Sequence, residues 1–253
     1  MTIGVGVQVH EGLVALADTH AAEGEHGSDT QRITTHEHDG YAFFVMTSGL
    51  PSACDTVTTR MEEDLAARDR PHVRLGELVT SLGHQLEAAR IGDGPALQTD
   101  GPPIDRRVIV GGQLRDDDRP GLFLVSPDGN WVMATEDSPS FIIGRSAYGK
   151  PILDRLLAAD TPLPRALALA YLAFDAAQSS VPDVEFPIDV LAFSEGGLRH
   201  RRFQPEDLAD VHDAWHVQLR VAVTELPTAW TTPLWRPSDE REVDADRDPR
   251  SRP

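Results

Sequence analysis

The chain has 253 residues, 40% of them hydrophobic and 25% charged, which is enough for one large globular domain or two small ones. Its formal net charge of -18 excludes a protein that binds nucleic acid through clustered cations. The single cysteine, Cys54, excludes an internal disulfide framework and favours a reducing, cytoplasmic setting. With no long apolar stretch and no signal-peptide pattern, we expect neither a membrane partner nor export.

The first half of the chain predicts a β-meander followed by two helices. Alternating apolar runs with short turns between them indicate strands, and apolar residues at helical spacing indicate helices. In chain order we expect strands at 2–9, 12–18 and within 33–49, one helix after Pro51, a second helix that ends at Gly92, and a Gly/Pro-rich loop at 93–105.

The second half repeats strands and then helices. We expect four strands in RRVIVGGQL, GLFLVSP, NWVMATED and SFIIG, two helices in GKPILDRLLAAD and PLPRALALAYLAFDAAQSS, a hairpin around Glu195-Gly196-Gly197, and a helix in PEDLADVHDAWHVQLRVAVTEL. Segregated runs of this kind favour an α+β fold with sheets packed face to face and helices outside. We expect residues 2–226 to form one domain and the Pro-rich, charged residues 227–253 to form a mobile tail.

Thr2 opens the first predicted strand directly after Met1. Removal of Met1 would give Thr2 a free α-amine, which titrates near neutral pH and can serve as the base for the threonine's own hydroxyl. Asp18 ends the neighbouring strand, where a carboxylate can orient the ammonium form of that amine. The pattern therefore predicts an N-terminal nucleophile, with an ordinary strand start as the alternative.

Several stretches resemble the bacterial proteasome-like Anbu family, which belongs to the proteasome-type N-terminal nucleophile (Ntn) hydrolases. EGLVALAD is similar to the segment GLVLASD of the wider class, and ATEDSPSFIIGRSAYGKPILDR, residues 134–155, is similar to an Anbu segment with IG and YGKPILDR in the same order. VIVGGQL, LFLVSPDGN and FPIDVL also fall where that family has strands. The likeness covers residues 2–226.

The resemblance implies an αββα four-layer sandwich of two antiparallel sheets flanked by helices. It implies that Thr2 is the nucleophile, that Asp18 orients its amine, that Gly49 donates a backbone N–H to the oxyanion, and that Asp175 is a distal carboxylate near the nucleophile. No cofactor or metal is implied. The expected protein is a cytoplasmic homo-oligomer, a ring or a spiral, that cleaves unfolded polypeptides or peptides; an ATP-dependent unfoldase partner stays open.

The sequence departs from the family at the presumed site. The family has a lysine on the third strand beside the threonine hydroxyl, whereas this chain has Arg32-Ile33-Thr34. We expect position 33 to be the lysine position and Arg32 to face the other side of the strand, so that Ile33→Lys would raise any weak activity. Three further departures are His20 for arginine, Arg145 for an acidic residue and Asp183 for serine.

Three functions therefore stay open. The first is a threonine-type peptidase, weakened or silenced by Ile33; the second is an inactive structural or binding subunit of the same fold; the third is an amidohydrolase that acts on a small amide. Other candidate sites carry ordinary interpretations: the pairs His36 and His38 or His212 and His216 as structural histidines, Cys54 as a lone thiol near a helix start, and Lys150, the chain's one lysine, as a surface charge.

Overall fold

The computed structural model describes residues 3–19, 32–38, 41–47, 59, 61, 63, 74–92, 107–195 and 197–235. They divide into two units, Met1–Leu208 and Ala209–Pro253, which are described separately.

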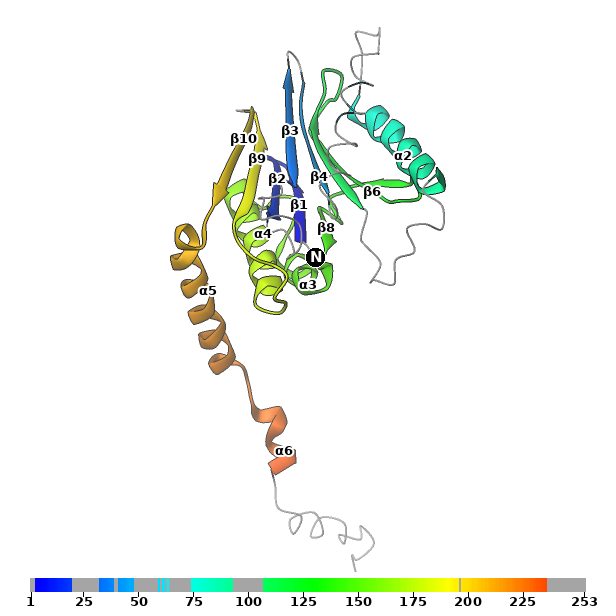
Figure 1. The fold of residues 1–253 in the computed structure, drawn as a ribbon. Helices are drawn as coiled ribbons and strands as arrows, with labels where there is room; N and C mark the ends of the chain where they lie inside the picture. Colours follow the sequence, from blue (N-terminus) through cyan, green and yellow to red (C-terminus); the bar gives the residue numbers. More distant parts are fainter. Residues whose placement is uncertain are drawn as a thin grey trace, which may run out of the picture. The chain divides into compact units, whose positions relative to one another are not determined.

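The first unit contains two antiparallel five-stranded sheets (Figure 1). The first sheet has the order β10-β9-β2-β1-β8, with strands β10 (Gly197–Phe203), β9 (Ile188–Ser194), β2 (Gly12–Asp18), β1 (Ile3–Val9) and β8 (Ser140–Gly144). The second sheet has the order β3-β4-β5-β6-β7, with strands β3 (Ile33–His38), β4 (Tyr41–Thr47), β5 (Val108–Gln113), β6 (Gly121–Val125) and β7 (Trp131–Met133).

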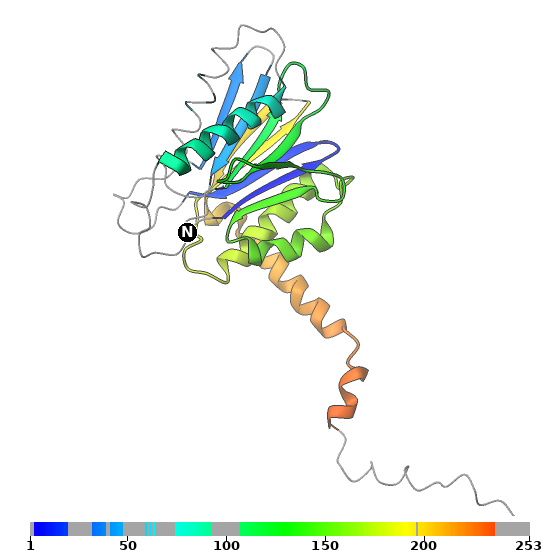
Figure 2. The same cartoon turned by 90° about the vertical axis from the view of Figure 1, so that its right-hand side faces the viewer.

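Helices cover the outer face of each sheet (Figures 1 and 2). Helix α2 (Leu75–Gly92) packs on the second sheet through a core that includes Leu78 and Phe123, and α3 (Ser146–Leu156) and α4 (Leu163–Gln178) cover the first sheet. A third core, which includes Ile33, lies between the sheets. These layers confirm the α+β, αββα sandwich of the Ntn-hydrolase type.

The alternation of residues in β1 explains how the layers come together. Its valines point into the core beneath α4, whereas Gly4 and Gly6 face the second sheet. A Cβ atom at Gly4 would lie 2.9 Å from the Met46 sulfur, and one at Gly6 would lie 3.1 Å from Ile109. The glycines of the GVGV run therefore allow the two sheets to approach closely.

The YGKPILDR segment forms most of α3, and its glycine has a packing role. A Cβ atom at Gly149 would lie 2.8 Å from the carbonyl oxygen of Ala173 and 2.9 Å from its Cβ, so glycine lets α3 lie directly against α4. Lys150 pairs with Asp154 at 2.8 Å on the exposed side of the helix. The expected surface role of Lys150 is confirmed.

The expected meanders are wrong in one respect, because each is divided between the two sheets. The hairpin β1–β2 lies in the first sheet and the hairpin β3–β4 in the second, and β2 pairs with β9 instead of β3. Likewise, β8 leaves its sequence neighbours and pairs with β1. Each hairpin buries one face beneath the helices and the other between the sheets, so face-to-face packing brings the inner faces of both hairpins into a single layer.

Helix α5 (Pro205–Glu225) begins in the first unit, and its residues from Ala209 onward belong to the second. The short helices η2 (Ala229–Thr231) and α6 (Thr232–Trp235) follow it. The predicted tail at 227–253 therefore includes two helical turns, while residues 236–253 lie outside the described part of the chain. Among the helices that the structure describes, none combines the length and apolarity that a bilayer crossing requires.

Candidate active site

The predicted site lies where β1 begins. Three strand ends meet there, because Gly144 of β8 stands opposite Ile3 and Ala17 of β2 stands opposite Gly4. Thr2 and Gly49, the predicted nucleophile and oxyanion donor, lie outside the described residues, as does His20. Asp18 and Asp175 lie within them.

Asp18 is fully buried, and its carboxylate reaches the first described residue of β1. The backbone N–H of Ile3 donates a hydrogen bond of 3.0 Å to Asp18 Oδ1. A charged acceptor makes such a bond stronger than a neutral one would. The Asp18 carboxylate therefore binds the backbone at the residue that follows Thr2 in the chain. Its role in orienting the N-terminus stays a prediction.

Arg32 supplies the cation beside that carboxylate. Its side chain is almost completely buried, and its Nε lies 3.9 Å from Asp18 Oδ1. Its backbone carbonyl accepts a 3.1 Å hydrogen bond from the N–H of Thr47 at the end of β4. The guanidinium therefore comes from the edge of the second sheet to a carboxylate of the first.

The expectation that Arg32 faces away from the presumed site is wrong, because its side chain reaches Asp18. A place for position 33 beside Thr2 stays a prediction, since Thr2 lies outside the described residues. Ile33 is fully buried in the core between the sheets, where it stands opposite Met46. The side chain that faces Asp18 is that of Arg32, the residue just before β3 begins. The sequence pattern could not show that Arg32 reaches Asp18, because the direction of its side chain depends on where β3 starts and how the sheets pack.

The turn after Asp18 is held by the start of β9. The backbone N–H and the hydroxyl of Thr19 each donate a 2.9 Å hydrogen bond to the carbonyl oxygen of Pro187. Thr19 is fully buried, so these two bonds satisfy its polar groups and fix the chain next to the carboxylate. Thr19 is a positioning residue that the sequence analysis missed.

A second buried carboxylate, Asp189 on β9, stands opposite Ala17. Arg202 of β10 donates two hydrogen bonds to it, at 2.9 and 3.0 Å, and His200 Nε2 lies 3.4 Å from Oδ1. Burial acts to raise the pKa of Asp189, but the hydrogen bonds from His200 and Arg202 outweigh it and lower the pKa. The signal in the sequence was an aspartate in an apolar strand followed by a strand with consecutive basic residues at 199–202.

Two of the residues that depart from the family pattern form an ion pair with each other. Arg145 follows Gly144 at the end of β8, and its guanidinium donates a 2.8 Å hydrogen bond to Asp183 Oδ2. That hydrogen bond lowers the pKa of Asp183. The pair is partly exposed and lies beside the start of β1. The positive charge of Arg145 therefore balances the negative charge of Asp183 at this edge.

Asp175 lies near the end of α4 and is buried. Burial first, and then the charge of Asp175, raise the pKa of Tyr171 to about 12. The other end of α4 is fixed at the β1–β2 turn, where Glu11 accepts a 2.8 Å hydrogen bond from the N–H of Leu163. Asp175 is about 18 Å further along the helix, toward the Asp18 end of the sandwich, and its contact with Thr2 stays a prediction.

The histidine candidates contact side chains of the same element or of the neighbouring strand. The ring of His36 stacks on Phe43 at 4.7 Å and its Nε2 lies 3.4 Å from the Thr34 hydroxyl. In the second unit, the rings of His212 and His216 lie 4.3 Å apart, one turn along α5. Cys54 lies outside the described residues.

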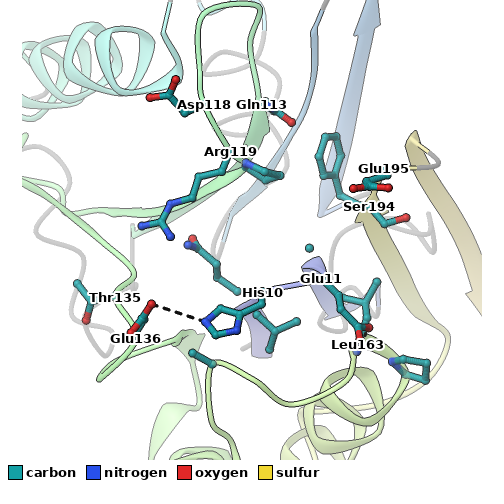
Figure 3. Close-up of a pocket in the computed structure, with 17 residues that line it drawn as sticks. His10, Glu11, Gln113, Asp118, Arg119, Thr135, Glu136, Leu163, Ser194 and Glu195 are labelled. Atoms are coloured by element: carbon teal, nitrogen blue, oxygen red, sulfur yellow. Dashed lines mark hydrogen bonds and ion pairs between the residues drawn. The ribbon is translucent and has the colours of Figure 1, made fainter.

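A pocket of about 1010 Å³ lies at the opposite end of the sandwich, around the β1–β2 turn (Figure 3). His10 and Glu136 face each other there at 3.6 Å, and Arg119 brings a cation. Gln8 lies in its wall and links the sheets, since its side-chain oxygen accepts a 2.9 Å hydrogen bond from the N–H of Leu122. The pocket contains none of the predicted site residues and both signs of charge.

The chain is similar to solved structures of Anbu proteins. A Gly-1 mutant of Anbu from Hyphomicrobium sp. strain MC1 is 28% identical with a TM-score of 0.78, and the match covers 90% of this chain and 98% of that one. Anbu, described as an ancestral beta-subunit, from Yersinia bercovieri is 23% identical with a TM-score of 0.76, covering 89% and 97% of the two chains.

A structure from Pseudomonas aeruginosa, described as a helical assembly of the Anbu complex, is 24% identical with a TM-score of 0.77, covering 94% of this chain and 99% of that one. At their identities the Yersinia and Pseudomonas structures show the shared fold alone. No protein-family model matches the chain, and no curated protein matches it. The likeness to the Anbu family that the sequence predicts is confirmed by these structures.

Proposed function

Since the chain is a relative of the Anbu proteins, we propose that it is a proteasome-like threonine-type peptidase subunit whose nucleophile is Thr2, exposed by removal of Met1. The observation that carries the proposal is the contact of the buried Asp18 carboxylate with the N–H of Ile3. A buried charge is costly unless it is paired or hydrogen-bonded, and here it is directed at the residue next to the threonine.

In the proposed reaction the α-amine of Thr2 takes the proton of the threonine hydroxyl, and the hydroxyl oxygen attacks the amide carbonyl. The amine returns the proton to the leaving nitrogen, and water then hydrolyses the acyl-enzyme. Asp18 orients the ammonium form of the amine, the Gly49 N–H stabilises the oxyanion, and Asp175 is the distal carboxylate.

Arg32 takes the place of the family's lysine in this proposal. A guanidinium stays protonated at every physiological pH, so it cannot accept a proton, but it stabilises a developing alkoxide through its charge. Lysine can do both. We therefore expect slower turnover than a lysine in the same place would give.

The absence of the family's lysine also supports a second candidate function, an inactive subunit of the same fold. Arg145 and Asp183 bring two further charges beside the start of β1, and the 2.8 Å pair that they form could close this edge to substrate. A structural or binding subunit would keep the fold and lack catalytic activity.

The proposal includes self-assembly, supported by the Pseudomonas structure, which is described as a helical assembly. We propose a homo-oligomeric ring or spiral that works in the cytoplasm and admits unfolded polypeptides or peptides. Residues 2–226 would form the proteasome-like domain and residues 227–253 a peripheral tail.

Intact mass measurement and an epoxyketone test the chemistry. An epoxyketone reacts with a hydroxyl and an amine on the same residue, so an adduct on wild type and on Thr2→Ser, but not on Thr2→Ala, supports the N-terminal nucleophile. Met1 retained in the purified protein overturns the α-amine mechanism. Met1 removed, with no adduct and no cleavage of fluorogenic peptides, favours the inactive subunit.

A further inference from the structure

The second half of α5 is apolar on two sides, and nothing in the described part of the chain covers it. Its side chains Val217, Leu219, Val221 and Val223, and that of Leu226 directly after it, are between 41% and 65% exposed. The helix contains no buried residue at all. A helix that is apolar on more than one side is normally buried, because water disfavours such a surface.

One of the two sides has the pattern of a self-pairing helix. Successive residues advance by about 100° around a helix, so Ala214, Val217 and Val221 form a stripe at spacings of three and four. Asp213 and Arg220 both flank this stripe on the same edge, seven residues apart. Leu219, Val223 and Leu226 belong to the opposite side.

The two flanking charges are unused within the chain. Among the residues that the structure describes, neither Asp213 nor Arg220 has a hydrogen-bond or ion-pair partner. Their spacing makes the stripe complementary to itself: when a second α5 runs antiparallel across it with Val217 near the centre, each Asp213 stands at the level of the other copy's Arg220. A parallel pairing would place the two copies of this edge on opposite sides of the interface, so that neither ion pair could form.

We propose that α5 docks antiparallel on α5 of a second copy of this chain, through the stripe Ala214, Val217 and Val221 and two Asp213–Arg220 ion pairs. The contact is isologous, as a two-fold axis requires, since the same residues serve both copies. It rests on the proposed self-assembly and names a surface for it. One apolar face is covered by the second copy, and the helix is stabilised by tertiary packing that a single helix cannot provide.

Charge reversal tests the ion pairs. Arg220→Asp places two acidic residues at each end of the helix pair, and Asp213→Arg places two basic ones. We expect sedimentation velocity at micromolar concentration to show a twofold or greater loss of mass for each single variant, and recovery of the wild-type mass in the double variant Asp213→Arg/Arg220→Asp. Val132→Ser, an exposed valine of β7 on the first unit, is the control and should keep the wild-type mass.

Cross-linking tests the register and the face. In a Cys54→Ser background, Val217→Cys lies next to its own copy at the two-fold axis and should form a disulfide-linked dimer under mild oxidation. Val223→Cys, on the opposite side of the same helix, should stay monomeric on a denaturing gel. Circular dichroism checks that both variants keep the wild-type helix content.

The outcomes separate this pairing from the proposals on which it rests. If wild type is an assembly, but the charge variants keep its mass and Val217→Cys does not cross-link, the pairing is overturned and self-assembly stands. If Val223→Cys cross-links instead, the wrong face has been assigned and the pairing falls. A wild type that is monomeric overturns both, while epoxyketone labelling of Thr2 reports separately on the peptidase.

Discussion

Arg32 and Asp18 come from opposite sheets and hold their charged groups 3.9 Å apart at the start of β1, where both side chains are almost wholly buried. The same carboxylate oxygen accepts the N–H of Ile3 at 3.0 Å. Strand β1, the turn after β2 and the residue before β3 are therefore fixed relative to one another by a single oxygen atom.

Asp18→Asn should reduce both activity and stability. The amide keeps the shape of the side chain but leaves the Arg32 guanidinium without the negative charge that balances it, so we expect the free energy of unfolding to fall by about 1 to 3 kcal/mol. Epoxyketone labelling of Thr2 should slow at least tenfold. The control is Asp154→Asn at the exposed pair with Lys150, which should change the free energy by less than about 1 kcal/mol. Equal effects of the two substitutions would contradict this account.

Position 33 and position 32 should respond in opposite ways to lysine. Ile33→Lys buries a charge in the core between the sheets and should destabilise the chain by more than about 4 kcal/mol without raising activity. Arg32→Lys keeps a cation beside Asp18 and should keep the fold while it raises peptide cleavage. Thermal unfolding and a fluorogenic peptide assay read out both variants. Rescue of activity by Ile33→Lys would show that the side-chain directions are reversed.

Acid should destabilise the folded chain by protonating Asp189. Because its pKa is lowered in the folded chain, the stability that it contributes is present above the pKa of the unfolded chain, about 4, and is lost as the pH falls through the folded value. Urea unfolding between pH 2.5 and 7 should show this loss below pH 4. Asp189→Asn should lower stability at pH 7 by about 3 kcal/mol and flatten the acid limb. If the variant loses as much stability below pH 4 as the wild type does, the ion pairs of Asp189 are not the source of that loss.

Two glycines in helices should respond to alanine with opposite signs. Gly149→Ala places a methyl group against the backbone of Ala173 and should cost about 1 to 3 kcal/mol, because α3 must move away from α4. At Gly76 in α2 the nearest atom to a new Cβ is in the Phe123 ring at 3.9 Å, so Gly76→Ala should stabilise the chain by about 0.5 to 1 kcal/mol. Chemical denaturation measures both; a neutral Gly149→Ala would mean that the helices adjust freely.

The local elements and the fold class follow from the sequence, because strand alternation and helical spacing are short-range signals. The resemblance adds the four layers. The partition of the hairpins between sheets does not follow, since it depends on which apolar faces meet after the chain has left the local element.

At the candidate site, the sequence identifies Asp18 at the end of β2 but does not predict that Arg32 contacts it. A carboxylate at a strand end keeps its place in any register, whereas the direction of Arg32 changes with one residue of strand start. The pairing of Arg145 with Asp183 spans 38 residues, and each appears in the sequence only as an isolated departure. Long-range complementarity of this kind is visible only once the fold has brought the end of β8 next to the segment that precedes β9.

The link between Gln8 and Leu122 at the far end of the sandwich differs in kind from the one at the site. An amide oxygen carries no net charge, so neither acid nor salt weakens that bond, whereas the attraction of Arg32 to Asp18 depends on ionisation. The two sheets are thus linked by a neutral hydrogen bond at one end and by an ionic contact at the other. Under acid stress the molecule should open first at the end that holds Asp18, so hydrogen exchange at the Ile3 amide should precede exchange at the Leu122 amide.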